Sequence, residues 1–153
     1  MIKPFSLNPL VNLAHQKNDA ATRKLGQLNQ QQQTAQTKLE TLQQFRKDYQ
    51  FKFQQAAQSG MDPTDLRNFQ DFINRLDQAI QQQQTVIEKA KSSVQSGRHN
   101  LMDTTRKMKS FDTLAQRHVE SEKKLEAKAD QRLQDEQTGR FAAFHSGEKP
   151  EDK

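Results

Sequence analysis

The residues that decide the fold are Gln58-Ser59-Gly60-Met61-Asp62-Pro63-Thr64-Asp65. Gly60 suits the left-handed conformation that often ends a helix. Asp62 suits the N-cap of a following helix, and Pro63 suits its first position. Asp65 places a negative charge in the first turn, where the helix dipole favours it. This short stretch therefore indicates the end of one helix and the start of another.

Two long proline-free segments flank this turn. Both are rich in Gln, Lys, Glu, Ala, Leu and Arg, which favour helices. We therefore predict helices over 8–58 and 63–138, joined by a turn at 59–62. Because the turn is short, the helices must fold back antiparallel. The predicted all-α hairpin occupies residues 1–139, and residues 140–153 are a predicted flexible tail.

Apolar residues in both segments recur at alternating spacings of three and four, which predicts a coiled coil. Centring the turn near residue 61 makes Ala35 face Ile87 and Ala21 face Leu101. The first segment contributes to the main seam Leu7, Ala14, Ala21, Leu28, Ala35, Leu42, Tyr49 and Ala56, and to a companion seam Val11, Asn18, Leu25, Gln32, Leu39, Arg46 and Phe53. The second contributes Leu66, Ile73, Ile80, Ile87, Val94, Leu101, Met108, Ala115 and, on its companion, Phe69, Leu76, Gln83, Ala90, Gly97, Thr104, Phe111, His118.

The composition argues against a compact enzyme. Only 31% of the 153 residues are hydrophobic, and 28% are charged. Globular domains usually draw about 45–50% of their residues from the apolar set, so a thick core around a buried cleft is excluded. The absence of cysteine excludes disulfides and thiolate chemistry. No apolar run approaches the ~18 residues of a membrane span, and the N-terminal residues lack a signal-peptide pattern. We therefore expect a cytoplasmic protein.

Neither catalysis nor metal binding is expected. The four histidines include no pair four residues apart, and the chain has no HExxH motif and no glycine-rich phosphate loop. Two helices also offer no third element with which to build a pocket. The sequence therefore predicts no catalytic residue, no cofactor and no metal site.

The net charge of +5 is unevenly distributed along the chain. Residues 1–58 carry eight Lys or Arg and three Asp or Glu, whereas residues 59–153 carry sixteen of each. A basic stretch at 89–109 has the charge to contact phosphates. It lacks interleaved aromatics and any nucleic-acid motif, so no nucleic-acid partner is expected. We interpret it as a solvated face or a docking face for an acidic protein.

Aromatic residues gather near the turn and exceed what a two-helix seam can bury. Phe45, Phe51 and Phe72 do not fit the seam. Phe45 and Phe72 fall on flanking positions beside Leu42, Leu76 and Ala79, which predicts an exposed apolar strip. Such a strip usually marks a partner site, the alternatives being a wider seam or self-association.

These residues resemble the FliJ family of the bacterial flagellar type III export apparatus. The likeness rests on Leu39…Leu42…Phe45…Tyr49 before the turn, Asn68-Phe69-Gln70…Phe72-Ile73…Leu76…Ala79-Ile80 after it, and the C-terminal DQRLQDEQTGRFA. The resemblance implies a non-enzymatic antiparallel coiled coil, similar to the central stalk of rotary ATPases.

The resemblance also implies partners and contact sites. The implied partners are the export ATPase FliI and its regulator FliH, the export gate protein FlhA, and export chaperones, which the protein helps to recycle. The implied location is the cytoplasmic face of the cell membrane at the flagellar base, with membrane contact only through the export apparatus. The gate-contact positions match Leu42, Phe45, Tyr49, Phe72, Leu76 and Ala79, with Lys38 and Gln83 flanking them. The ATPase-ring end corresponds to Arg23, Lys24, Arg98, Arg106, Lys107 and Lys109.

Other functions remain open at the level of sequence. One is a generic coiled-coil scaffold or secretion chaperone, including the stalk of a virulence injectisome. Another is a basic helical hairpin associated with nucleic acid, which a salt-dependent gel shift would reveal.

Overall fold

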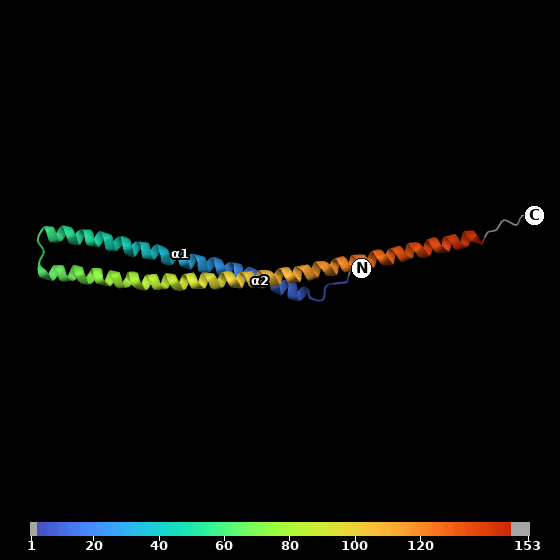
Figure 1. Cartoon of the computed structure of the whole chain (residues 1–153), viewed down its shortest axis with the longest axis horizontal. Helices are drawn as coiled ribbons and strands as arrows, with labels where there is room; N and C mark the ends of the chain where they lie inside the picture. Colours follow the sequence, from blue (N-terminus) through green and yellow to red (C-terminus); the bar gives the residue numbers. More distant parts are fainter. Residues whose placement is uncertain (1–2, 148–153) are drawn as a thin grey trace, which may run out of the picture. The chain divides into compact units, whose positions relative to one another are not determined.

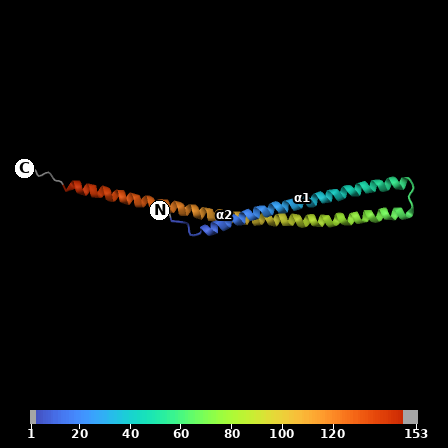
Figure 2. The ribbon, with the colours of Figure 1, turned by 180° about the vertical axis from the view of Figure 1, so that it is seen from behind.

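The computed structural model describes residues 3–147. It contains two helices, α1 (Asn8–Gln58) and α2 (Pro63–Ser146), and no strand within the described residues. The chain leaves α1 at the turn and returns along it as α2 (Figures 1 and 2). The predicted fold class, an antiparallel two-helix coiled-coil hairpin, is confirmed.

The turn between the helices follows from its residues. Gly60 has a φ of 89°, the left-handed conformation that glycine adopts without steric cost. Its N–H donates to the Ala57 carbonyl at 3.3 Å, which closes the last turn of α1. The Leu66 N–H donates to the Asp62 carbonyl at 3.0 Å, so Asp62 occupies the N-cap of α2.

The residues of the two helices group into two compact units. The turn unit is Lys17–Thr105, and the terminal unit combines Met1–Gln16 with Arg106–Lys153. A seam of two helices has no central core, because each layer of side chains contacts only the adjacent layers. The hairpin can therefore divide between layers, and we describe each unit by itself.

The predicted seams account for the buried residues of the turn unit. Ala35, Leu39 and Ile87 form its buried cluster, with Ile80 packed against them. This cluster confirms the predicted pairing of a small residue, Ala35, with a large one, Ile87. The other buried residues of this unit also lie on predicted seam positions: Ala21, Leu76, Gln83, Val94 and Gly97.

Hydrogen-bonded polar side chains interrupt the apolar seam of the turn unit. Gln83 is buried, and its Nε2 donates to the Ala35 carbonyl oxygen at 2.9 Å. Farther from the turn, the Asn18 Oδ1 accepts from the Thr104 hydroxyl at 3.2 Å and from the Thr105 hydroxyl at 2.8 Å. These hydrogen bonds pair polar groups whose burial would otherwise cost free energy.

Contacts in the terminal unit hold the N-terminal residues against α2. The His118 Nε2 lies 2.8 Å from the Lys3 carbonyl oxygen, and the His118 ring packs on Phe5 with centroids 5.3 Å apart. The His15 Nε2 lies 2.7 Å from an Asp112 carboxylate oxygen. His118 therefore acts in packing and hydrogen bonding, and His15 acts in hydrogen bonding.

The end of α2 differs from the prediction. The helix continues to Ser146 rather than stopping at 138, so the first residues of the predicted tail are helical. Gly139 costs about 1 kcal/mol relative to alanine, which is too little to stop a helix that Arg140, Ala142 and Ala143 then favour. Residues 148–153 of the predicted tail lie outside the described residues. From residue 123 to 147 every side chain is exposed.

Candidate interaction surface

An aromatic cluster lies in the turn unit, close to the turn. The ring centroids of Tyr49 and Phe72 are 4.3 Å apart, and those of Tyr49 and Phe69 are 4.9 Å apart. Phe53 and Phe69 follow at 5.6 Å. The rings meet at tilted angles, which aromatic pairs prefer to face-to-face stacking. Tyr49 thus joins the two helices and brings Phe72 to the edge of the seam.

The six predicted gate-contact residues have different exposures. Phe45 is 59% exposed and Phe72 42% exposed, whereas Leu42, Tyr49 and Ala79 are half-buried. Leu76 is buried at 9% and belongs to the seam, because its companion-seam position points at α1. Gln83, predicted at the rim of this strip, is likewise buried.

The exposed members of this strip share one flank of the hairpin. Phe72 and Ala79 lie seven residues apart on α2, and Phe45 occupies the matching flanking position on α1. Seven residues make almost two helical turns, so side chains at this spacing stay on one face. Continuing the spacing adds Val86, which is 48% exposed. We call Phe45, Phe72, Ala79 and Val86 the apolar flank.

Val86 was missed by the sequence reasoning because it follows closely after the glutamine tract at 81–84. Its seven-residue spacing from Ala79 was the available signal. A hollow of about 390 Å³ is lined by Val86 and Gln83 of α2 and by Ala35, Lys38, Gln30, Gln31 and Thr34 of α1. The apolar flank therefore extends beyond the six predicted residues and reaches a groove between the helices.

The opposite flank of the turn unit is polar. The Arg46 guanidinium donates to the Asp77 carboxylate at 2.5 and 3.4 Å, and to the Gln50 amide oxygen at 2.9 Å. Asp77, through its hydrogen bond and then its charge, raises the pKa of Arg46. Other positions at seven-residue spacing on this flank are also polar: Gln36, Gln43, Gln70 and Gln84. The two flanks of one coiled coil thus differ sharply in chemistry.

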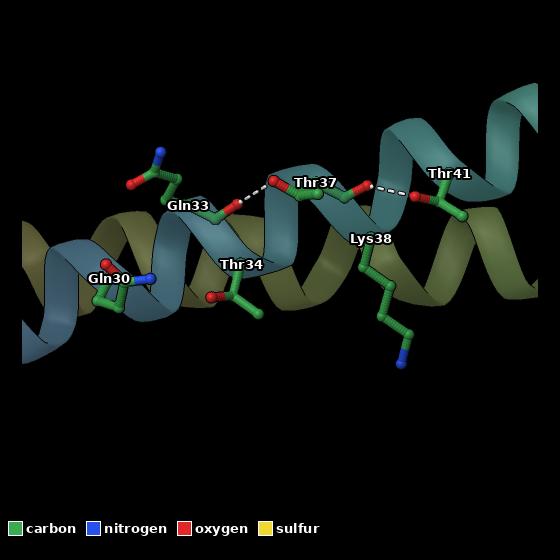
Figure 3. A pocket seen from close by; sticks show the side chains of 6 residues that line it. All are labelled: Gln30, Gln33, Thr34, Thr37, Lys38 and Thr41. Atoms are coloured by element: carbon green, nitrogen blue, oxygen red, sulfur yellow. Dashed lines mark hydrogen bonds between the residues drawn. The ribbon is translucent and has the colours of Figure 1, made fainter.

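The polar face of α1 beside the apolar flank contains an unpaired lysine. A shallow hollow of about 580 Å³ is lined by Gln30, Gln33, Thr34, Thr37, Lys38 and Thr41. The Thr37 and Thr41 hydroxyls donate to the carbonyls one turn earlier, each at 3.0 Å. Lys38 extends from the helix without an ion-pair partner among the described residues (Figure 3).

The six residues predicted for the ATPase-ring end are divided between the two units. Arg23, Lys24 and Arg98 lie in the turn unit. Arg106, Lys107 and Lys109 lie in the terminal unit. All six side chains are exposed, and none forms an ion pair within residues 3–147. Each group therefore presents uncompensated positive charge on its own unit.

Within residues 3–147, no three His, Cys, Asp or Glu side chains come close enough to hold a metal ion. In the same residues, neither helix contains a stretch long and apolar enough to cross a membrane.

Comparison of the sequence with family profiles identifies the chain. The profile described as "Flagellar FliJ protein" matches residues 3–146, which cover both helices and both units. The chain belongs to the FliJ family. It is therefore a component of flagellar type III protein export, in a family of non-catalytic structural components. Association with the export apparatus in general follows from this membership.

A known structure shows the same fold as this FliJ-family chain. A structure described as a putative YscO homologue from Chlamydia trachomatis has a TM-score of 0.70 and is 13% identical in sequence. The match covers 96% of this chain and 99% of that one. At this identity the likeness concerns the fold alone. Comparison with the sequences of curated proteins found no match.

Proposed function

We propose that this FliJ-family protein is the stalk of the flagellar export ATPase and couples the ATPase to the export gate. The observation that carries the proposal is the apolar flank beside the turn, where Phe45 and Phe72 are exposed on a protein that otherwise has few apolar residues to bury. Exposed apolar patches of this kind commonly mark a protein partner. Membership of an export family makes the gate protein FlhA the first partner to test.

The exposed basic groups support an ATPase contact. Arg106, Lys107 and Lys109 follow one another closely on α2 of the terminal unit, and they lack ion-pair partners among the described residues. Such residues contribute to association through long-range attraction to an acidic surface. We propose that they meet the ATPase FliI, and that Arg23, Lys24 and Arg98 add to this contact.

The remaining parts of the proposal concern assembly. The stalk promotes formation of the FliI ring, and it contacts export chaperones and the regulator FliH as they cycle at the gate. The protein then acts at the cytoplasmic face of the membrane at the flagellar base. In this role its loss abolishes flagellum assembly and motility.

The ATPase contact is tested by the hydrolysis rate and oligomeric state of the cognate FliI, with and without this protein. We expect both ring formation and turnover to rise. Changing Arg106, Lys107 and Lys109 together to Glu should abolish most of the rise. The matched control changes Lys123, Lys124 and Lys128 to Glu, because these lysines are also exposed on α2 of the terminal unit. Equal stimulation by both triple variants contradicts the assigned contact.

The gate contact needs a separate experiment, on the purified cytoplasmic region of FlhA. We expect Phe45→Ser with Phe72→Ser to weaken binding at least about tenfold, as loss of two aromatic anchors does. Phe51→Ser is the matched control, because Phe51 is 60% exposed but lies on the outer face of α1. Unchanged affinity of the double variant, with full helicity, overturns the assignment.

A further inference from the structure

The apolar flank has the spacing of a third coiled-coil seam. Phe72, Ala79 and Val86 follow one another at seven residues on α2, and together they span about 21 Å at 1.5 Å per residue. Apolar residues at this spacing match the packing of a helix laid alongside, whose own side chains recur with the same period. The polar flank, with Arg46, Asp77 and glutamines, offers no such seam.

The groove at the far end of this flank has room for a side chain from such a helix. Ala35 and Gln83 are both buried, at 7% each, and form the lining closest to the seam. Val86 and Lys38 line the hollow from opposite helices, and its volume is about 390 Å³. A knob from a third helix would occupy this hollow between the two helices.

The charges beside the flank favour an acidic partner. Lys38 and Lys52 lie seven residues before and after Phe45 on α1, at the same flanking position. Neither forms an ion pair within the described residues. Asp65, seven residues before Phe72 on α2, is the one acidic residue at these flanking positions, so the two lysines leave the flank with a net positive charge. A second copy of this chain seated there would carry the same net charge, which opposes its binding. Glutamates flanking the apolar face of a different helix would complement the lysines.

We propose that the apolar flank receives an amphipathic α-helix of another protein, apolar on one face and acidic at its edges, to form a three-helix coil that reaches Val86. This inference rests on the proposed function, because its first three residues are those assigned to the gate. It adds the form and charge of the partner segment, and it adds Val86 and Lys38 as contacts.

The first probe is a fluorescein-labelled synthetic peptide of about three heptads, with Leu at the seam positions and Glu beside them. We expect it to bind the full chain in fluorescence anisotropy. Val86→Ser and Lys38→Glu should each weaken binding at least about fivefold. Gln84→Ser is the control, because Gln84 is exposed on the polar flank. A second peptide with Lys in place of Glu should bind more weakly than the first.

The second probe is the cytoplasmic region of FlhA, which separates this inference from the proposed function. Gate binding that Val86→Ser and Lys38→Glu leave unchanged overturns the three-helix coil but not the stalk. Peptide binding with the expected variant pattern, without gate binding, supports the acidic-helix site and contradicts the gate assignment. Failure of both probes overturns the inference, as does equal binding of the two peptides. A dimer that Val86→Ser dissolves overturns it in favour of a second copy.

Discussion

The side-chain amide of Gln83 donates a 2.9 Å hydrogen bond from Nε2 to the backbone carbonyl oxygen of Ala35 on the opposite helix. Both residues are buried, next to the apolar pair of Leu39 and Ile87. One polar residue in a coiled-coil seam typically specifies register, at a cost in stability. Gln83 therefore ties α2 to one position along α1.

Substitutions at Gln83 test how much its hydrogen bond contributes to the stability of the hairpin. We expect Gln83→Ala to lower the free energy of unfolding by about 1–2 kcal/mol, because the hydrogen bond and the packed side chain are both lost. Gln83→Leu should raise it by about 1 kcal/mol, because an apolar side chain replaces a buried polar one. Urea denaturation followed by circular dichroism gives both values. Gln82→Leu, on an exposed neighbour, is the control. A loss of stability in Gln83→Leu would contradict this account.

Ile87 should carry much of the stability of the turn unit. It is only 4% exposed, and Ile87→Ala should cost about 2–4 kcal/mol, because it leaves a cavity opposite Ala35. The neighbouring Val86 is 48% exposed, so Val86→Ala should change stability by less than about 0.5 kcal/mol. Amide hydrogen exchange of α2 in the two variants measures the difference. Similar amide protection of α2 in Ile87→Ala and Val86→Ala would mean that the seam does not form the stabilising core of the turn unit.

Two helical glycines should respond differently to alanine. A Cβ added at Gly26 would meet no atom within 4 Å, so Gly26→Ala should raise stability by about 1 kcal/mol through helix propensity. At Gly97 the new Cβ would lie 2.8 Å from the Leu28 Cδ1, so that side chain must move. The displacement of the Leu28 side chain should cancel much of the stability that Gly97→Ala gains through helix propensity. Thermal unfolding of the two variants side by side tests this, and a larger gain at Gly97 would contradict the close approach.

The pair of Arg46 and Asp77 should contribute a modest, salt-sensitive stabilisation. Because Asp77 raises the pKa of Arg46, this contribution is complete below the ordinary arginine pKa and is lost only as pH rises through the higher folded value. It should therefore stay constant through the neutral range. Asp77→Asn should lower the Tm more at low salt than at high salt, whereas Asp71→Asn, at an exposed residue without a partner among those described, should not. If Asp77→Asn lowers the Tm equally at low and high salt, the charge of the pair does not explain the stabilisation.

The candidate surface was predictable only in part. The aromatic excess near the turn correctly indicated that Phe45 and Phe72 are exposed, because a two-helix seam buries two positions per heptad. The same reasoning placed Leu76 with them and missed Val86. Whether a flanking side chain is covered depends on the residue that the other helix brings against it, and the periodicity of one helix does not contain that information.

The sequence by itself determined the turn, the two helices and the seam between them. These follow from local preferences, such as the left-handed conformation of Gly60 shortly before Pro63, and from a heptad period that is present in the sequence of each helix. Only the tertiary structure decided that Gln83 bonds to Ala35 and that one flank is apolar and the other polar. The continuation of α2 through Gly139 to Ser146 is instead a local property, because every side chain from residue 123 to 147 is exposed. Pairings and exposures depend on side chains far apart in the chain, whereas a helix end depends on a small balance of propensities that no single residue settles.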